Sequence, residues 1–558
     1  MENRKKPELL IPAAGLEVLK TAVIFGADAV YIGGEAFGLR AKAKNFTMEE
    51  MAEGISFAHA RGVKVYVTAN ILAHNEDLEG AERYFGELRD MKPEPCDALI
   101  ISDPGLFTIA KAVWPEAEIH ISTQANNTNY QTYLFWWRLG AKRVVSAREL
   151  SLEEIHVIRE HIPEEMEIES FVQGSMCISY SGRCLLSNYF TGRDANRGSC
   201  THPCRWKYAV VEETRPGEYL PVYENERGTY IFNSKDLCMI EHIPELVEAG
   251  IDSFKIEGRM KTALYVAAVT RTYRRAIDDY FDSPDKYASG MAWYREEISK
   301  CTHRHFSTGF YFGKPGSESQ IYDNSTYVNE YTYLGMIEET EKEPRAWQDE
   351  GRRGTVMAEG GREPEAVMAE KDREPEAVMA ERDRKPEAVM AERNRKPEAA
   401  MAERDREPEA VMAERDWKPE AAMSIRDRRP EATMAERDRK PEAAMAERDR
   451  ETEAETAEDG QEAEAVEPKK GVQEGKSSEK SRLARFEQRN KFTVGESIEI
   501  MKPDGRNVAV TVEALYTEDG EAVESCPHAR QVLWVRLSEN AECGDLLRRR
   551  ETKDGSEG

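Results

Sequence analysis

The sequence contains no run of about 18 apolar residues, the length that a helix needs to cross a membrane. Its first residues, MENRKKPELLIPAAG, also lack the apolar core of a secretory signal peptide. We therefore expect a cytoplasmic protein with no membrane partner. In that reducing compartment the 9 cysteines are expected to be thiols or metal ligands rather than disulfides.

Three motifs of enzyme chemistry are also missing. The sequence has no H-E-x-x-H zinc helix and no G-x-S-x-G nucleophile elbow, and no G-x-G-x-x-G loop follows an apolar run. These absences argue against a metalloprotease, an α/β-hydrolase and a dinucleotide-binding fold. A cysteine nucleophile with one of the 10 histidines stays open, because such pairs need not be close in sequence.

Apolar residues are scarce in one long stretch. From Pro364 to Pro441 the sequence repeats every 11 residues with a consensus close to PEAVMAERDRK, and residues 451–468 then hold eight carboxylates and no basic residue. Such closely spaced prolines leave helices too short to be stable alone, and each unit has little apolar surface to bury. We predict that 341–481 is a disordered spacer, with an interaction protein that uses the repeats as the alternative.

The first 300 residues alternate short β-branched runs with amphipathic segments, which is typical of α/β folds. Eight strands is the number of a (β/α)8 TIM-like barrel, and a doubly wound open sheet is the alternative. The predicted strands are 8–13, 29–34, 64–71, 98–103, 118–124, 143–149, 167–174 and 252–258.

Strand patterns return after Ser481 and predict a small β-barrel. One further candidate strand, 326–339, precedes the repeats and has no sheet of its own. We expect it to pair with the strands after Ser481. The second domain would then comprise 301–340 and 482–550, split by the spacer.

Five of the cysteines lie between Cys177 and Cys238, in a predicted insertion at 175–235 of the barrel domain. Thiolates bind iron-sulfur clusters or zinc, and four are needed to close either site. The spacing matches no common zinc finger. Separate core thiols are the alternative.

The same segment resembles a known family. The stretch ESFVQGSMCISYSGRCLLS (169–187) is similar to the signature of peptidase family U32, the collagenase-like proteins. The runs NRGSCTHPCRW, FKIEGRMK, HRHFSTGF and FEQRNKF resemble its tRNA hydroxylation protein P branch. The resemblance covers roughly 1–340 and 484–550.

The resemblance implies a tRNA-modifying enzyme that makes 5-hydroxyuridine at the wobble position, with prephenate as co-substrate. It implies a 4Fe-4S cluster on Cys177, Cys184, Cys200 and Cys238, with Cys204 as the alternative to Cys200. A related protein of the family is an expected partner beside tRNA. Proteolysis, as the family name states, is the alternative activity.

Parallel strands place functional side chains at their carboxyl ends. The candidates there are Asn70, Asp103, Gln124, Glu149, Glu169, Lys255, Glu257 and Arg259. We expect catalytic roles for Glu169, Lys255, Glu257 and Arg259, and substrate binding for the others. Lys255 and Arg259 suit a dicarboxylate such as prephenate, and a buried salt bridge to Glu257 is the alternative.

Between Tyr180 and Val210 five basic residues face a single carboxylate, Asp194. Aromatic residues among cations are typical of surfaces that bind unstacked bases and phosphates. We expect Arg193, Arg197 and Arg205 to bind RNA, with a solvated loop as the alternative. The remaining cations are Arg183 and Lys207, and the aromatic residues are Tyr180, Tyr189, Phe190, Trp206 and Tyr208.

Overall fold

The structure is a computed structural model that describes residues 5–38, 45–206, 209–211, 219–221, 234–315, 327–341 and 483–551. The 11-residue repeats, Lys207 and Tyr208 lie outside these residues. In the part of the chain that is described, no helix is long and apolar enough to span a bilayer.

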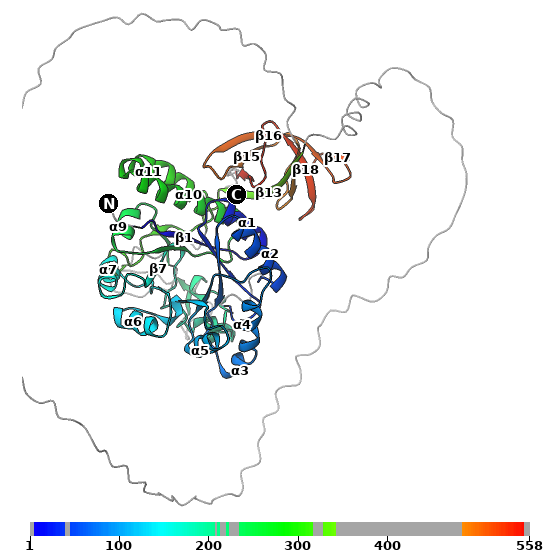
Figure 1. Ribbon diagram of the computed structural model, residues 1–558. Helices are drawn as coiled ribbons and strands as arrows, with labels where there is room; N and C mark the ends of the chain where they lie inside the picture. The colour runs from blue at the N-terminus through cyan, green and yellow to red at the C-terminus, as the bar shows by residue number, and fades with distance from the viewer. Residues whose placement is uncertain are drawn as a thin grey trace, which may run out of the picture. The chain divides into compact units, whose positions relative to one another are not determined.

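The amino-terminal domain is a closed barrel of parallel strands (Figure 1). The strand order is sequential from β1 to β7, and β11 pairs with both β7 and β1 to close the circle. The predicted barrel is confirmed, because an open sheet would leave two unpaired edges. Its strands are β1 (Glu8–Pro12), β2 (Ala29–Gly33), β3 (Lys64–Ala69), β4 (Ala98–Ile101), β5 (Glu118–Ile121), β6 (Arg143–Val145), β7 (Glu167–Ser175) and β11 (Ser253–Ile256).

Helices follow the strands and bury the apolar outer face of the barrel (Figure 1). Two of them begin with a capping box, at Thr47 with Glu50 and at Ser151 with Glu154, and the second was predicted. The helices are α1 (Leu16–Ile24), α2 (Met48–His59), α3 (Asn75–Leu78), α4 (Ala81–Arg89), α5 (Pro104–Val113), α6 (Tyr130–Arg138), α7 (Leu152–His161), α9 (Ile243–Glu248), α10 (Ala263–Asp282) and α11 (Pro284–Ser299).

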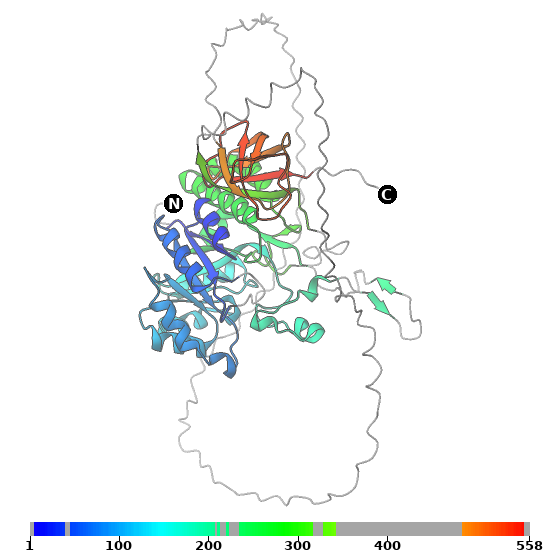
Figure 2. The same cartoon turned by 90° about the vertical axis from the view of Figure 1, so that its right-hand side faces the viewer.

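The cysteine-rich segment lies between β7 and β11 in the chain and is the teal part of Figure 2. It ends in a strand that pairs antiparallel with the end of β7, so the segment is attached directly to the barrel wall. Its elements are α8 (Leu186–Thr191), the short 3-10 helices η2 (Ala195–Arg197) and η3 (Pro203–Arg205), β8 (Ala209–Val211), β9 (Tyr219–Pro221) and β10 (Asp236–Cys238), which β12 (Phe306–Ser307) extends.

The second domain is an antiparallel six-stranded barrel with one short extra strand, β17. The strand before the repeats, β13, pairs with β14 and β19 from beyond them, as the sequence predicts. At the end of this ladder Glu341 lies opposite Leu483. The strands are β13 (Tyr331–Glu341), β14 (Leu483–Glu487), β15 (Ser497–Met501), β16 (Asn507–Tyr516), β17 (Ala522–Val523), β18 (Val532–Leu537) and β19 (Leu546–Arg550).

Both barrels belong to one compact unit, and buried polar contacts join them. Arg271 on α10 donates to the Lys502 carbonyl at 2.8 Å and to Asn507 Oδ1 at 2.7 Å. Asn507 in turn donates to Glu297 on α11 at 2.8 Å. These contacts satisfy charges that would be costly to bury alone.

Candidate functional site

Two neighbouring cavities lie at the carboxyl ends of the barrel strands. The inner one, about 50 Å³, is in the barrel mouth, and the outer one, about 480 Å³, lies between the mouth and the cysteine-rich segment. Both are lined by Thr123, Gln124, Phe171 and Glu257. The outer volume is in the range of ligand pockets, whereas the inner one has room for a few waters or a single carboxylate group.

The inner cavity carries two cations, Lys255 and Arg259. Arg259 is only 5% exposed and donates to Thr68 Oγ1 at 2.5 Å. A Cβ on Gly33 would come within 2.4 Å of its guanidinium, so only glycine leaves room for this side chain at the end of β2. The two cations and the carboxylate of Glu257 thus line one polar pocket, in which the cations suit an anionic group.

Amide and hydroxyl groups complete the wall of the inner cavity. Asn70, at the end of β3, donates to Ser122 Oγ at 3.2 Å and to Gln124 Oε1 at 3.3 Å. Ser122 also contacts Gln124 Oε1. This group lies where the sequence predicts it, and its side chains hold one another in place across β3 and η1 (Thr123–Ala125).

Glu257 reaches the mouth because of an irregularity between β7 and β11. The register shifts between Lys255 and Ile256, and Gly174 there has φ 112°. A Cβ on Gly174 would lie 2.5 Å from the Glu257 carbonyl, so the close approach requires glycine. The bulge places Glu257 between the two cavities.

Lys255 pairs with Glu169. The alternative given above, a buried salt bridge from Lys255 to Glu257, is therefore wrong. Lys255 Nζ lies 2.5 Å from Glu169 Oε1, and the pair is buried inside the barrel. Burial raises the pKa of Glu169, but the charges of Lys255 and Arg143 outweigh it and lower that pKa. Glu169 lines neither cavity, so the structure gives it a place in the barrel interior rather than at the mouth.

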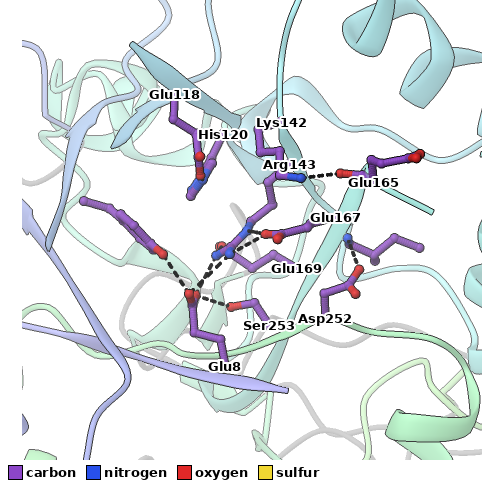
Figure 3. Close-up of polar contacts among 12 residues, drawn as sticks. Glu8, Glu118, His120, Lys142, Arg143, Glu165, Glu167, Glu169, Asp252 and Ser253 are labelled. Atoms are coloured by element: carbon purple, nitrogen blue, oxygen red, sulfur yellow. Dashed lines mark hydrogen bonds and ion pairs between the residues drawn. The ribbon is translucent and has the colours of Figure 1, made fainter. Parts of the chain in front are cut away.

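Below this pair, charged side chains fill the amino-terminal end of the barrel (Figure 3). Arg143 lies 2.6 Å from both Glu8 and Glu167 and 3.1 Å from Glu169. Burial raises the pKa of Glu8, but Arg143 and a hydrogen bond from Tyr66 lower it to about 2. We call this network the barrel floor. Apart from Glu169, its residues were not predicted, because they are at the opposite strand ends from the site.

Four cysteines line the outer cavity: Cys177, Cys184, Cys200 and Cys204. Burial raises the pKa of Cys204, the charge of Arg205 opposes this, and the three other thiols add smaller contributions that raise it further. Among the described residues, no three cysteine, histidine or carboxylate side chains converge tightly enough to hold a single metal ion. A four-iron cluster is wider than one ion, so thiols spread round a cavity fit it better than they fit zinc.

Cys238, the fourth ligand expected from the resemblance, does not line the outer cavity. It lies on β10 opposite Gln173, and its thiol meets the Tyr273 hydroxyl on α10. Burial raises the pKa of Cys238 to about 12. The structure thus brings Cys204 together with the other three thiols and holds Cys238 against the helix layer.

Arg148 links the cysteines to the barrel and was not predicted. Its guanidinium donates to the Ser175 carbonyl at 2.9 Å, to Cys177 Sγ at 3.2 Å and to Ser181 Oγ at 2.6 Å. Arginine donors suit sulfur that carries negative charge. Its place at the end of a predicted strand, beside Glu149, was the signal that could have found it.

The other predicted residues have varied positions. Asp103 caps α5 by accepting from Gly105 N at 2.8 Å, so it serves the helix rather than the cavities. Glu149 lies outside both cavities, and burial raises its pKa. Asp103 and Glu149 are therefore not brought to the predicted substrate site.

The three arginines that were predicted to bind RNA differ in their contacts and exposure. Arg197 pairs with Glu76 at 2.8 Å and Asp77 at 2.5 Å, which fastens the cysteine-rich segment to α3. Arg205 lines the outer cavity and donates to the Tyr327 hydroxyl at 3.2 Å. Arg193 is exposed. Arg193 and Arg205 are thus open to a ligand, while Arg197 has a structural role.

Comparisons with known proteins agree with this architecture. The family model described as Peptidase family U32 matches residues 14–321, and that of the Peptidase family U32 C-terminal domain matches residues 471–548. The chain is 45% identical over 333 residues to tRNA hydroxylation protein P1 of Bacillus subtilis, covering 60% of this chain and 77% of that protein.

Two further relatives come from Escherichia coli. The chain is 40% identical over 373 residues to its tRNA hydroxylation protein P, covering 59% of this chain and 81% of that protein. The chain is also 34% identical over 326 residues to the 23S rRNA 5-hydroxycytidine C2501 synthase of the same organism. This match covers 58% of this chain and 47% of that protein. The resemblance stated from the motifs is confirmed, and because the family model spans more than half of the sequence, this chain belongs to peptidase family U32.

Proposed function

We propose that this protein hydroxylates RNA, and that its substrate is the wobble uridine of tRNA, which it converts to 5-hydroxyuridine. The observation that carries the proposal is the outer cavity, where four thiols face a polar, cationic barrel mouth. The names of the relatives, which describe hydroxylation of tRNA and a 5-hydroxycytidine of rRNA, support the same reaction class.

The outer cavity would hold an iron-sulfur cluster on Cys177, Cys184, Cys200 and Cys204. When bound, a 4Fe-4S cluster supplies one-electron redox or Lewis-acid chemistry. Arg148 would orient Cys177 through its hydrogen bond to the sulfur. Such outer contacts commonly change metal affinity or activity by about 10- to 100-fold when they are removed.

The inner cavity would bind one carboxylate of a dicarboxylate co-substrate such as prephenate. With about 50 Å³ it takes a carboxylate but no ring, so the rest of the molecule would extend into the outer cavity. Arg259 would neutralise the bound charge, and Lys255, whose charge Glu169 balances, would offer its remaining N–H donors. A flipped base would enter the outer cavity from the exposed side.

A peptidase mechanism competes for the same groups. Hydrolysis needs a nucleophile and a base, and thiols that ligate a cluster are not free to attack a peptide bond. We therefore expect purified protein to leave collagen and casein intact. Loss of a protease activity in Cys177→Ala would favour the peptidase alternative.

The direct test is mass spectrometry of tRNA nucleosides. Deleting the gene should remove 5-hydroxyuridine and the modifications made from it, once a second enzyme of the same activity has been deleted as well. Complementation with the wild-type gene should restore them, and Arg259→Gln should not. Unchanged nucleosides in the complete deletion strain contradict the proposal.

A further inference from the structure

The cysteine-rich segment exposes an unusual share of the large apolar side chains. Of the 12 exposed large hydrophobic residues among those that the structure describes, five lie between residues 180 and 206. Scattered exposed apolar residues are ordinary, but a concentration on one short segment marks an interaction surface. These five are Tyr180, Leu185, Tyr189, Phe190 and Trp206.

Three of the rings form a continuous row. The ring centroids of Tyr189 and Phe190 are 5.2 Å apart, and those of Phe190 and Trp206 are 6.1 Å apart. Tyr189 is 82% exposed. Aromatic rings that contact one another and still face solvent leave flat apolar surface for a further planar group.

The row leads to the outer cavity. Trp206 directly follows Arg205, which lines the cavity together with Tyr180. A ligand bound on the rings would therefore continue into the cysteine-lined space. We call Tyr189, Phe190 and Trp206 the aromatic row.

The charges round the aromatic row favour a polyanion. Arg183 and Arg193 are exposed in the same segment, where Arg183 donates to Asn126 Oδ1 at 2.6 Å. The nearby carboxylate, Asp194, accepts a hydrogen bond from Asn188 Nδ2 at 2.5 Å. A ligand that is both negatively charged and planar is a nucleic acid strand.

We propose that the aromatic row stacks unpaired RNA bases that flank the reacting nucleotide, an inference that rests on the proposed RNA hydroxylation. Base faces are accessible in a loop but covered by their neighbours in a duplex. The row therefore selects single-stranded loops, while the arginines contact the phosphates of any RNA. This assigns loop selectivity to the segment that also carries the four thiols.

The test is RNA binding by Tyr189→Ala, Phe190→Ala and Trp206→Ala in the full chain. Each variant should bind an RNA stem-loop about 5- to 150-fold more weakly than wild type, because one stacked base contributes about 1–3 kcal/mol. Binding of a continuous duplex with the same stem should not change. The slope of affinity against salt concentration should also be unchanged, since no phosphate contact is lost.

Phe135 provides a matched control, because it is 49% exposed on α6 while Phe190 is 46% exposed. Phe135→Ala should bind both RNAs like wild type. A second comparison is Arg193→Gln, which should weaken binding of both RNAs. The slope of log affinity against log salt concentration should become shallower by about 0.7 for the loss of one phosphate contact. Thermal unfolding of every variant reports whether the fold is intact.

The outcomes separate the two proposals. If wild type binds the stem-loop and no aromatic variant binds it more weakly, base stacking on the aromatic row is contradicted. The proposed RNA hydroxylation is not affected by that result. Variants that change self-association in sedimentation, with unchanged RNA affinity, identify the row as a contact between copies and also overturn it. Wild-type protein that binds neither RNA overturns the row, and the nucleoside measurement then decides the proposed function by itself.

Discussion

Lys255 and Glu169 form an ion pair inside the barrel, with Nζ 2.5 Å from Oε1 and both side chains almost fully buried. Removing one partner of such a pair leaves an uncompensated charge, which typically costs about 3–5 kcal/mol. We expect Glu169→Gln to lower the free energy of unfolding by this amount. Urea unfolding followed by tryptophan fluorescence measures it.

A double variant separates stability from chemistry. Glu169→Gln combined with Lys255→Met removes both charges and should recover part of the lost stability. The exposed Glu513→Gln on β16 is the control and should unfold like wild type. Full stability with lost tRNA modification in Glu169→Gln would instead support the catalytic role that we first expected.

Glu8 makes the stability of the barrel floor dependent on pH. Its pKa is about 2 in the folded protein against an ordinary value of 4.5, so its contribution is complete above pH 4.5 and is lost as pH falls towards 2. The shift corresponds to about 3 kcal/mol at neutral pH. Glu8→Gln should therefore be less stable than wild type by about this amount at pH 7.

The difference in free energy of unfolding between wild type and Glu8→Gln should shrink when urea unfolding is repeated from pH 5 down to pH 3. Glu513→Gln should show no such trend, because its side chain is exposed. A difference that stays constant over this pH range would mean that Arg143 does not hold Glu8 in its charged form.

The cysteine positions predict which thiols bind iron. Protein purified without oxygen should be brown, and Cys177→Ala, Cys184→Ala, Cys200→Ala and Cys204→Ala should lose iron and colour. Cys238→Ala should keep both, because its thiol faces Tyr273. Iron analysis and visible absorption measure this.

Cys543→Ala is the control for an exposed thiol far from the site in sequence, and it should keep its iron. Retention of iron in Cys204→Ala with loss in Cys238→Ala would restore the ligand set that the family resemblance implies. Stoichiometric zinc without iron in wild type would contradict the cluster itself.

The spacer should be dispensable for folding. Glu341 and Leu483 are paired neighbours at the end of the β13–β14 ladder, so a short Gly/Ser turn can join them. Replacing residues 345–478 by such a linker should leave cooperative unfolding and iron content unchanged. Insoluble protein, or a lower unfolding midpoint, would show that the repeats contribute to the core.

The barrel was predictable because each strand is a short apolar run that is buried on both faces, which β2 illustrates with five buried residues. The capping box at Ser151 and the pairing of β13 across the spacer also followed from local patterns. These features depend on residues that are close in sequence, or on one strand that needs a partner.

The functional site was harder to predict than the fold, because it depends on the direction in which each side chain points. Asn70 and Gln124 follow their strands and face the mouth, but Asp103 turns back to cap α5. The sequence likewise does not show that Arg197 meets Asp77 across 120 positions, nor that Cys238 turns towards Tyr273. Such pairings depend on tertiary distances that no local pattern encodes.

The pairing of Glu341 with Leu483 has a consequence for how the gene can change. Eleven residues correspond to a whole number of codons, so gain or loss of one repeat by slippage keeps the reading frame and returns the chain to the same strand. The composition of the spacer predicts a flexible connection, and doubling the length of such a connection costs only about 0.6 kcal/mol of closure free energy. On this expectation, the number of repeats can change without a loss of folding stability that selection would act against.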